Sequence, residues 1–120
     1  MSGLLAEVAI RGVVGEDRGM AHVVTVFRSR VRPEYEAEYH ALAPRIEELA
    51  RSMSGFVDVA FFTADDGERV TIVTFASRAE HNAWRDHPEH RDAQRLGRER
   101  FYASYSIQVA EVDYDQRYDA

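Results

Sequence analysis

The sequence predicts an α+β domain with the element order β-α-β-β-α-β, and three observations support this prediction. Segments with apolar residues at helical spacing alternate with segments rich in β-branched and aromatic residues. An Asp-Asp-Gly turn joins two of the strand-like segments directly. The chain has 120 residues, close to the commonest size of a single domain. This element order is the ferredoxin-like arrangement.

Residues 22–31 are the first predicted strand, because HVVTVFRSRV is rich in β-branched and aromatic residues. Pro33 begins a helix at a position where the missing backbone N–H does no harm. The apolar stripe of this helix consists of Tyr35, Tyr39, Leu42, Ile46, Leu49 and Met53. Pro44 interrupts the stripe and is expected to kink the helix or to split it. Ser54-Gly55 ends it.

Residues 56–63 and 69–75 are the second and third predicted strands, rich again in β-branched and aromatic residues. Asp65-Asp66-Gly67 lies between them and is a strong hairpin signal. We therefore expect these strands to be antiparallel neighbours.

Two helices and a strand complete the pattern. Ser77-Arg78-Ala79-Glu80 has the spacing of a capping box and begins a short helix that carries Trp84. Another helix is expected over roughly 88–102, and a final strand over 105–112. One face of that strand is formed by Tyr105, Ile107 and Val109.

The predicted domain occupies residues 20–113, followed by a C-terminal tail at 114–120. Residues 1–19 are expected to be a flexible arm, either loose throughout or with a short strand around Val8–Ile10. The first residues lack the basic start and cleavage site of a secretory signal, and no apolar run approaches the ~20 residues that span a bilayer. We therefore expect a cytoplasmic protein with no membrane partner.

Helices on one face of a four-stranded sheet leave its other face bare. That face is predicted to be apolar, and such a patch on a small domain normally marks an interface. Two sheets stacked face to face bury both patches. The expected assembly is therefore a homodimer that closes into a dimeric α+β barrel.

The composition excludes several kinds of chemistry. Cys is absent, which removes disulfides, thiolate metal sites and thiol nucleophiles. Lys is absent as well, which excludes Schiff-base chemistry and P-loop nucleotide binding. The net charge of −6 argues against a nucleic-acid partner.

Trp84 and a polar stripe on the last helix are the first candidates for a binding site. Trp84 either fills core space or forms a flat wall for an aromatic ligand. His90, Gln94, Gly97 and Phe101 share one helical face that is too polar for ordinary core. A glycine there allows close approach to the sheet or to a ligand. The face is therefore either a half-exposed helix edge or part of a site.

The histidines and tyrosines near this stripe also have two interpretations each. His87 and His90 have a two-residue gap, but a metal needs three or four convergent ligands, so no metal site is expected. His87 is otherwise simply the start of a helix. Tyr102 and Tyr105 either pack with a hydrogen-bonded tip or transfer protons.

Two arginines lie among the apolar residues of the first strand. Arg28 and Arg30 are expected to form ion pairs across the sheet or the dimer. The acidic partners expected are Asp58 or Glu111. The alternative is that one arginine binds a phenolate or carboxylate of a substrate.

Three stretches together resemble a known family: TVFRSRVRPEYEAEY, then Ser54-Gly55-Phe56, then AWRDHPEHRDAQRLGRERFYASYSIQVAEV. On these residues the chain from His22 to about Asp113 is similar to the antibiotic-biosynthesis monooxygenases, a group of dimeric α+β barrels. Trp84 followed by His87-Pro88-Glu89-His90 is the most specific part.

The resemblance implies a pocket between sheet and helices. Members of the family oxidise phenolic or anthrone-like polyketides with molecular oxygen and without flavin or metal. The deprotonated substrate itself supplies the electron, so the protein need only bind, orient and deprotonate it. A related branch binds and degrades haem with a pocket Asn, a Trp and a helical His.

Carried over by position, the match is partial. Trp84 occupies the Trp position of both branches. The haem branch has its His ten residues later, at Gln94 here, and its Asn at about Phe27, which argues against haem. The quinone-forming branch has an Asn four residues before the Trp, here Glu80, and a Tyr six residues after it, here His90.

The hypothesis is a cofactor-independent monooxygenase that oxidises an electron-rich aromatic or polyketide-type molecule. His90 would take the proton, since its ordinary pKa of ~6.5 suits a base near neutral pH. Trp84 and Phe101 would stack the substrate, and Gln94 or Arg28 would orient the oxyanion. The other expected substrate contacts are Phe27, His87 and Tyr105.

The alternative is a non-catalytic small-molecule-binding or structural barrel, with a haem protein less favoured. Trp84 and Phe101 packed together without a cavity would favour the structural reading. An open, mainly apolar cavity of several hundred Å³ would favour a ligand.

Overall fold

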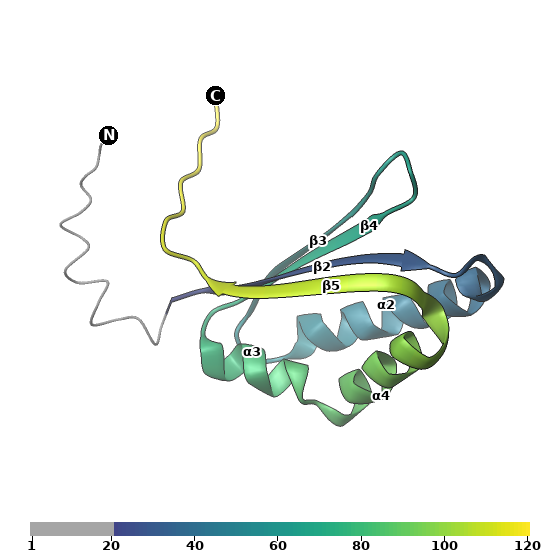
Figure 1. Cartoon of the computed structure of the whole chain (residues 1–120). Coiled ribbons are helices and arrows are strands. Elements are labelled where there is room, and N and C mark those ends of the chain that lie inside the picture. Colours follow the sequence, from purple (N-terminus) through teal and green to yellow (C-terminus); the bar gives the residue numbers. More distant parts are fainter. Residues whose placement is uncertain (1–20) are drawn as a thin grey trace.

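The computed structural model describes residues 21–120, and it contains one four-stranded antiparallel sheet with helices on one face (Figure 1). The expectations for residues 1–19, including the strand around Val8–Ile10, lie outside the described residues. The elements are β2 (Val23–Val31), η2 (Pro33–Tyr35), α2 (Glu36–Ser52), β3 (Phe56–Thr63), β4 (Arg69–Phe75), α3 (Arg78–Arg85), α4 (Pro88–Leu96), η3 (Gly97–Phe101) and β5 (Tyr102–Glu111). The predicted order β-α-β-β-α-β is confirmed.

The strands lie in the order β3-β4-β2-β5, so that β2 is central and pairs with β4 on one side and β5 on the other. Because side chains alternate along a strand, each strand presents one set of residues to the helices and one set to the opposite side. We call the side without helices the open face. Its apolar members are Val24, Val26, Ala60, Phe62, Val70, Ile72 and Ala110.

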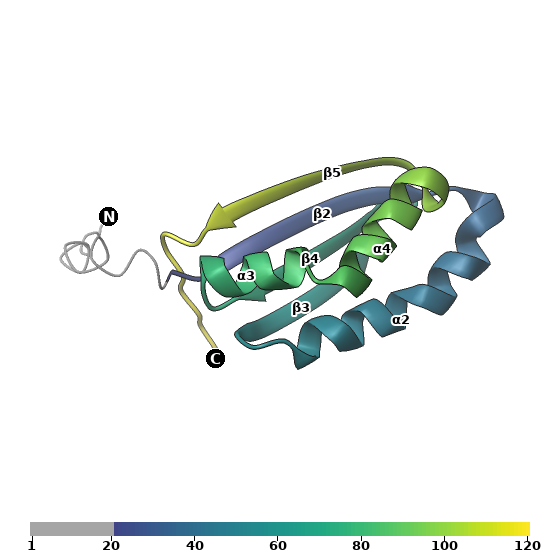
Figure 2. The same cartoon turned by 90° about the horizontal axis from the view of Figure 1, so that it is seen from below.

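Helix α2 is continuous from Glu36 to Ser52 although it contains Pro44. Proline removes one backbone N–H, which costs the helix a hydrogen bond to the preceding turn. Of the two expected outcomes, the split into two segments is wrong, because α2 continues through Pro44. Figure 2 shows that α2 bends along its length rather than breaking.

The core lies between α2, α3 and the central strands. Val23 and Phe75 are completely buried, and Ala50, Val73 and Trp84 pack in the same cluster as Phe75. Ser77 begins α3 as predicted, since its hydroxyl accepts the N–H of Glu80 at 3.2 Å. The capping box thereby fixes the helix that carries Trp84 beneath the sheet.

The arginines of β2 have other partners than expected. Arg28 forms two hydrogen bonds with the carboxylate of Glu68, at 2.9 and 2.8 Å, and Arg30 pairs with Asp66 at 2.8 Å. The predicted pairing with Asp58 or Glu111 is wrong within the chain, because β4 runs beside β2. That neighbour brings the end of the β3–β4 hairpin next to both arginines.

The helix predicted over 88–102 ends differently. Helix α4 stops at Leu96, and a π-helical turn, η3, continues to Phe101. Strand β5 therefore begins at Tyr102, three residues before the predicted start at 105. Such π turns occur frequently at functional sites.

We expect Gly97→Ala to lower the free energy of unfolding by about 1–3 kcal/mol, as overpacking typically does. A Cβ at Gly97 would overlap the ring of Tyr102. Helix propensity alone predicts the opposite sign, since Ala is favoured over Gly by roughly 0.5–1 kcal/mol. Urea unfolding of the two proteins measures the difference.

The control is the same substitution in a Tyr102→Ala background, where no ring remains to be displaced. There Gly97→Ala is expected to be neutral or stabilising. Equal destabilisation in both backgrounds would contradict the explanation.

Candidate functional site

A cavity of about 390 Å³ lies between the sheet and the helices. This volume is within the ~300–1,000 Å³ typical of ligand sites. All four strands, α2, α3, α4 and η3 contribute to its walls. The aromatic and polar side chains that line it include Thr25, Phe27, Tyr39, His81, Trp84, His90, Gln94, Phe101, Tyr102 and Tyr105.

Trp84 belongs both to the core and to the cavity wall. Its indole is 8% exposed and stacks on Phe75 at a ring distance of 5.3 Å and on His90 at 4.2 Å. Phe101 also lines the cavity, so these two aromatic residues do not close it. The indole Nε1 is buried and has no hydrogen-bond partner within residues 21–120.

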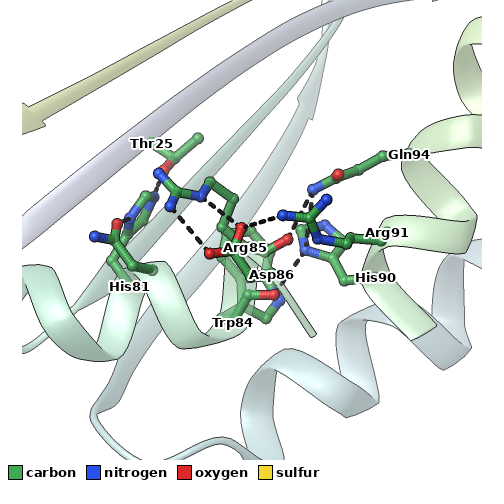
Figure 3. A network of polar contacts seen from close by, with 9 residues as sticks. Thr25, His81, Trp84, Arg85, Asp86, His90, Arg91 and Gln94 are labelled. Atoms are coloured by element: carbon green, nitrogen blue, oxygen red, sulfur yellow. Dashed lines mark hydrogen bonds and ion pairs between the residues drawn. The ribbon is translucent and has the colours of Figure 1, made fainter. Parts of the chain in front are cut away.

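His90 lies on α4 with its ring parallel to that of Trp84, at an interplanar angle of 24°. Its Nδ1 is 3.1 Å from the carbonyl oxygen of Trp84 (Figure 3). A carbonyl only accepts, so Nδ1 carries the proton and Nε2 is left as a lone-pair acceptor. Burial lowers the pKa of His90 below its ordinary value of 6.5, which keeps the ring neutral at pH 7.

Gln94 lies one turn after His90 and also lines the cavity. Its side-chain amide donates to the backbone carbonyl of Arg85 at 3.1 Å (Figure 3). His90 and Gln94 thus bond to two carbonyl groups in the last turn of α3, where the carbonyl of Trp84 also accepts the backbone N–H of His87 at 3.2 Å. The contacts hold α3 and α4 together beside the cavity.

An aromatic cluster forms another wall of the cavity. Phe27 on β2 contacts Tyr102 and Tyr105 with ring distances of 5.3 and 5.6 Å. Tyr39 on α2 contacts Tyr102 at 6.1 Å. Burial raises the pKa of Tyr39 and of Tyr102, so both phenols stay protonated near neutral pH. They are therefore hydrogen-bond donors rather than bases.

Two residues singled out in the sequence are not brought to this cavity. Arg28 projects from the open face, where Glu68 binds its guanidinium. His87 is the N-cap of α4, and its Nδ1 accepts the N–H of Glu89 at 3.1 Å. Glu80, at the family's Asn position, accepts hydroxyl hydrogen bonds from Ser54 and Ser77 as part of the capping of α3.

His81 lines the cavity but is not singled out by the sequence. Its ring is 2% exposed and lies 3.0 Å from the hydroxyl of Thr25 on β2. The one available signal is spacing, because His81 is three residues before Trp84 and therefore on the same side of α3.

Among residues 21–120 no group of three or more His, Asp or Glu side chains is arranged to hold a metal ion. Within the same part of the chain, no helix has the length and apolar character needed to cross a bilayer.

Comparisons with known proteins agree with this architecture. The family model described as antibiotic biosynthesis monooxygenase matches residues 20–96. An uncharacterised protein of Bacillus subtilis, YqjZ, is 36% identical over 88 residues, which are 73% of this chain and 77% of the relative.

Two solved structures share the fold at low sequence identity. SnoaB, a cofactor-independent oxygenase from Streptomyces nogalater, has a TM-score of 0.67 and 15% identity and covers 79% of this chain and 96% of its own. A protein from Deinococcus radiodurans, described as a possible antibiotic biosynthesis monooxygenase, has a TM-score of 0.72 and 12% identity and covers 82% and 99%.

Proposed function

The chain belongs to the antibiotic biosynthesis monooxygenase family, and on this premise we propose that it oxidises an electron-rich aromatic or polyketide-type molecule with molecular oxygen and without a cofactor. The observation that carries the proposal is the position of the His90 ring in the cavity. The neutral ring lies in an aromatic-lined cavity, stacked on Trp84, with one nitrogen available as an acceptor.

The cavity suits a flat apolar ligand that has an acidic hydroxyl or an activated CH group. Trp84, Phe101 and Phe27 supply aromatic surface, which favours stacked or edge-on ligand rings. The hydroxyls of Tyr39 and Tyr102 are hydrogen-bonded to each other, and the pair supplies one phenolic donor for a carbonyl or an oxyanion of the ligand. Arg98 also lines the cavity and adds positive charge that stabilises an anionic ligand, together with Arg85, whose guanidinium is paired with Asp86.

The chemistry needs little from the protein beyond positioning and proton removal. His90 Nε2 takes a proton from the bound substrate, and the resulting anion is the electron donor to oxygen. In the case of an anthrone, the CH₂ group becomes a carbonyl, and the second oxygen atom leaves as water. Gln94 is bonded to the backbone of α3 in the free protein, so we assign it to joining α4, which carries His90, to α3.

The experiment is an oxygen-uptake assay with a panel of anthrones and naphthols, run with a chelator present and no flavin added. We expect uptake above buffer for at least one member, together with a quinone product that contains an atom of labelled oxygen. Saturable binding without uptake across the panel would instead favour a non-catalytic small-molecule-binding protein. If no member of the panel is bound or oxidised, both the monooxygenase and the small-molecule-binding function would be contradicted for these compounds.

A further inference from the structure

His81 is a second histidine in the cavity, and hydrogen bonds at both ring nitrogens show which of them carries the proton (Figure 3). His81 Nδ1 lies 2.9 Å from Asn82 Oδ1, an oxygen that only accepts, so Nδ1 carries the proton. Nε2 is then a lone-pair acceptor. The hydroxyl of Thr25, 3.0 Å away, donates to it.

The direction of the hydrogen bond between Thr25 and His81 decides which ligand group Thr25 can bind. Thr25 and His81 both line the cavity, and they are 3% and 2% exposed. Because the Thr25 hydroxyl gives its only hydrogen to His81, its oxygen keeps lone pairs that can accept a hydrogen bond. A ligand hydroxyl is therefore the matching group for Thr25. The chain of donors runs from the cavity through Thr25 to His81.

We propose that Thr25 and His81 form a proton relay that ionises a hydroxyl group of an aromatic ligand bound in the cavity. Thr25 contacts the ligand, and His81 is a positioning residue behind it that receives the proton. The inference rests on the proposed function and adds a second acceptor beside His90 in the same cavity.

The transfer balances without any further reactant. The O–H bond of the ligand breaks as a new O–H bond forms at Thr25 Oγ1, and the original Thr25 proton moves to His81 Nε2. The ligand becomes an oxyanion and His81 becomes an imidazolium. Asn82 Oδ1 accepts from the Nδ1–H of His81 and stabilises this charged form.

The test uses a nitronaphthol, whose ionised form absorbs visible light, titrated with pH under nitrogen. Bound to the wild-type protein, the probe is expected to ionise at least about tenfold more readily than in solution, a pKa about one unit lower. Thr25→Val and His81→Asn are expected to lose most of this difference. Thr25→Ser keeps the hydroxyl and is expected to retain it.

Two controls separate the relay from other effects. His22→Asn changes an exposed histidine outside the cavity and is expected to behave as wild type. The arginines at the cavity also favour an anion, but Thr25→Val leaves both in place. A difference that survives in Thr25→Val would therefore belong to the arginines or to His90, and it would overturn the relay.

Nitrogen NMR of the wild-type protein tests the relay even where a variant does not fold. With ¹⁵N-labelled histidine, the two ring nitrogens of His81 are expected to move to imidazolium values when the probe binds. A ring that stays neutral, or a probe that does not bind or ionises as in solution, would overturn the proposal. If the oxygen-uptake assay gives no uptake, that result counts against the proposed oxidation alone. The titration of the probe is run without oxygen and tests the relay by itself.

Discussion

Replacing His90 by Ala is expected to lower kcat/KM for aromatic oxidation by about 10²–10⁴-fold, the usual contribution of a positioned general base. His90 Nε2 is a free acceptor in the cavity, because Nδ1 donates to the carbonyl of Trp84. Ala leaves no acceptor at this position. Steady-state oxygen uptake with the best substrate of the panel measures the change.

The pH dependence of the wild-type protein provides an independent check. A base must be unprotonated, so activity falls as the pH drops through the pKa of His90. Burial lowers this pKa below 6.5. The acidic limb of kcat/KM is therefore expected below pH 6.5, and in His90→Ala this limb is expected to disappear.

The control is His22→Asn, which removes an exposed histidine and is expected to retain full activity. Thermal unfolding of His90→Ala identifies any loss caused by the missing stack on Trp84. A folded His90→Ala protein with wild-type kcat/KM would exclude His90 as the base.

The second expected result concerns the open face. We propose that two copies pack these faces together, because the half-buried apolar residues Val24, Val26, Val70 and Ile72 have no helix above them. Sedimentation at micromolar concentration is expected to show twice the chain mass of 13.7 kDa.

Ile72→Asp is expected to dissociate the proposed dimer, since it would place an unpaired carboxylate in the middle of the interface. An uncompensated buried charge costs about 3–5 kcal/mol, which for one carboxylate corresponds to an increase in dimer Kd on the order of 10²–10⁴-fold. Ala41→Asp adds the same charge on the exposed side of α2 and is expected to leave the dimer intact. A wild-type monomer, or a dimer that tolerates Ile72→Asp, would exclude this interface.

The predicted elements follow from local patterns, which is why most of them agree with the structure. Alternating residues specify β2 and β5, and the capping box at Ser77 specifies the start of α3. The π turn at Gly97 is not visible in the pattern, because the stripe of His90, Gln94, Gly97 and Phe101 keeps the steps of three and four that an α-helix has. The start of β5 is displaced for this reason.

The site is predicted less completely, because its geometry depends on contacts between distant segments. Trp84 and His90 stand out in the sequence through their residue types and spacing. His81 does not, since its partner Thr25 lies 56 residues away on another element. The pairing of Arg28 with Glu68 likewise depends on where the β3–β4 hairpin ends in space.

The strand order has a consequence for how the chain folds. Strands β3 and β4 are joined by a short turn, whereas β2 must pair with β5 across most of the chain, with Val23 opposite Glu111. Closing so long a loop costs entropy before its contacts form, so long-range pairings are slow. During synthesis the β3–β4 hairpin can form early, whereas one edge of β2 stays unpaired until β5 has been made. Since Tyr102 and Tyr105 lie on β5, the wall of the cavity that they form with Phe27 is completed only when folding is nearly finished.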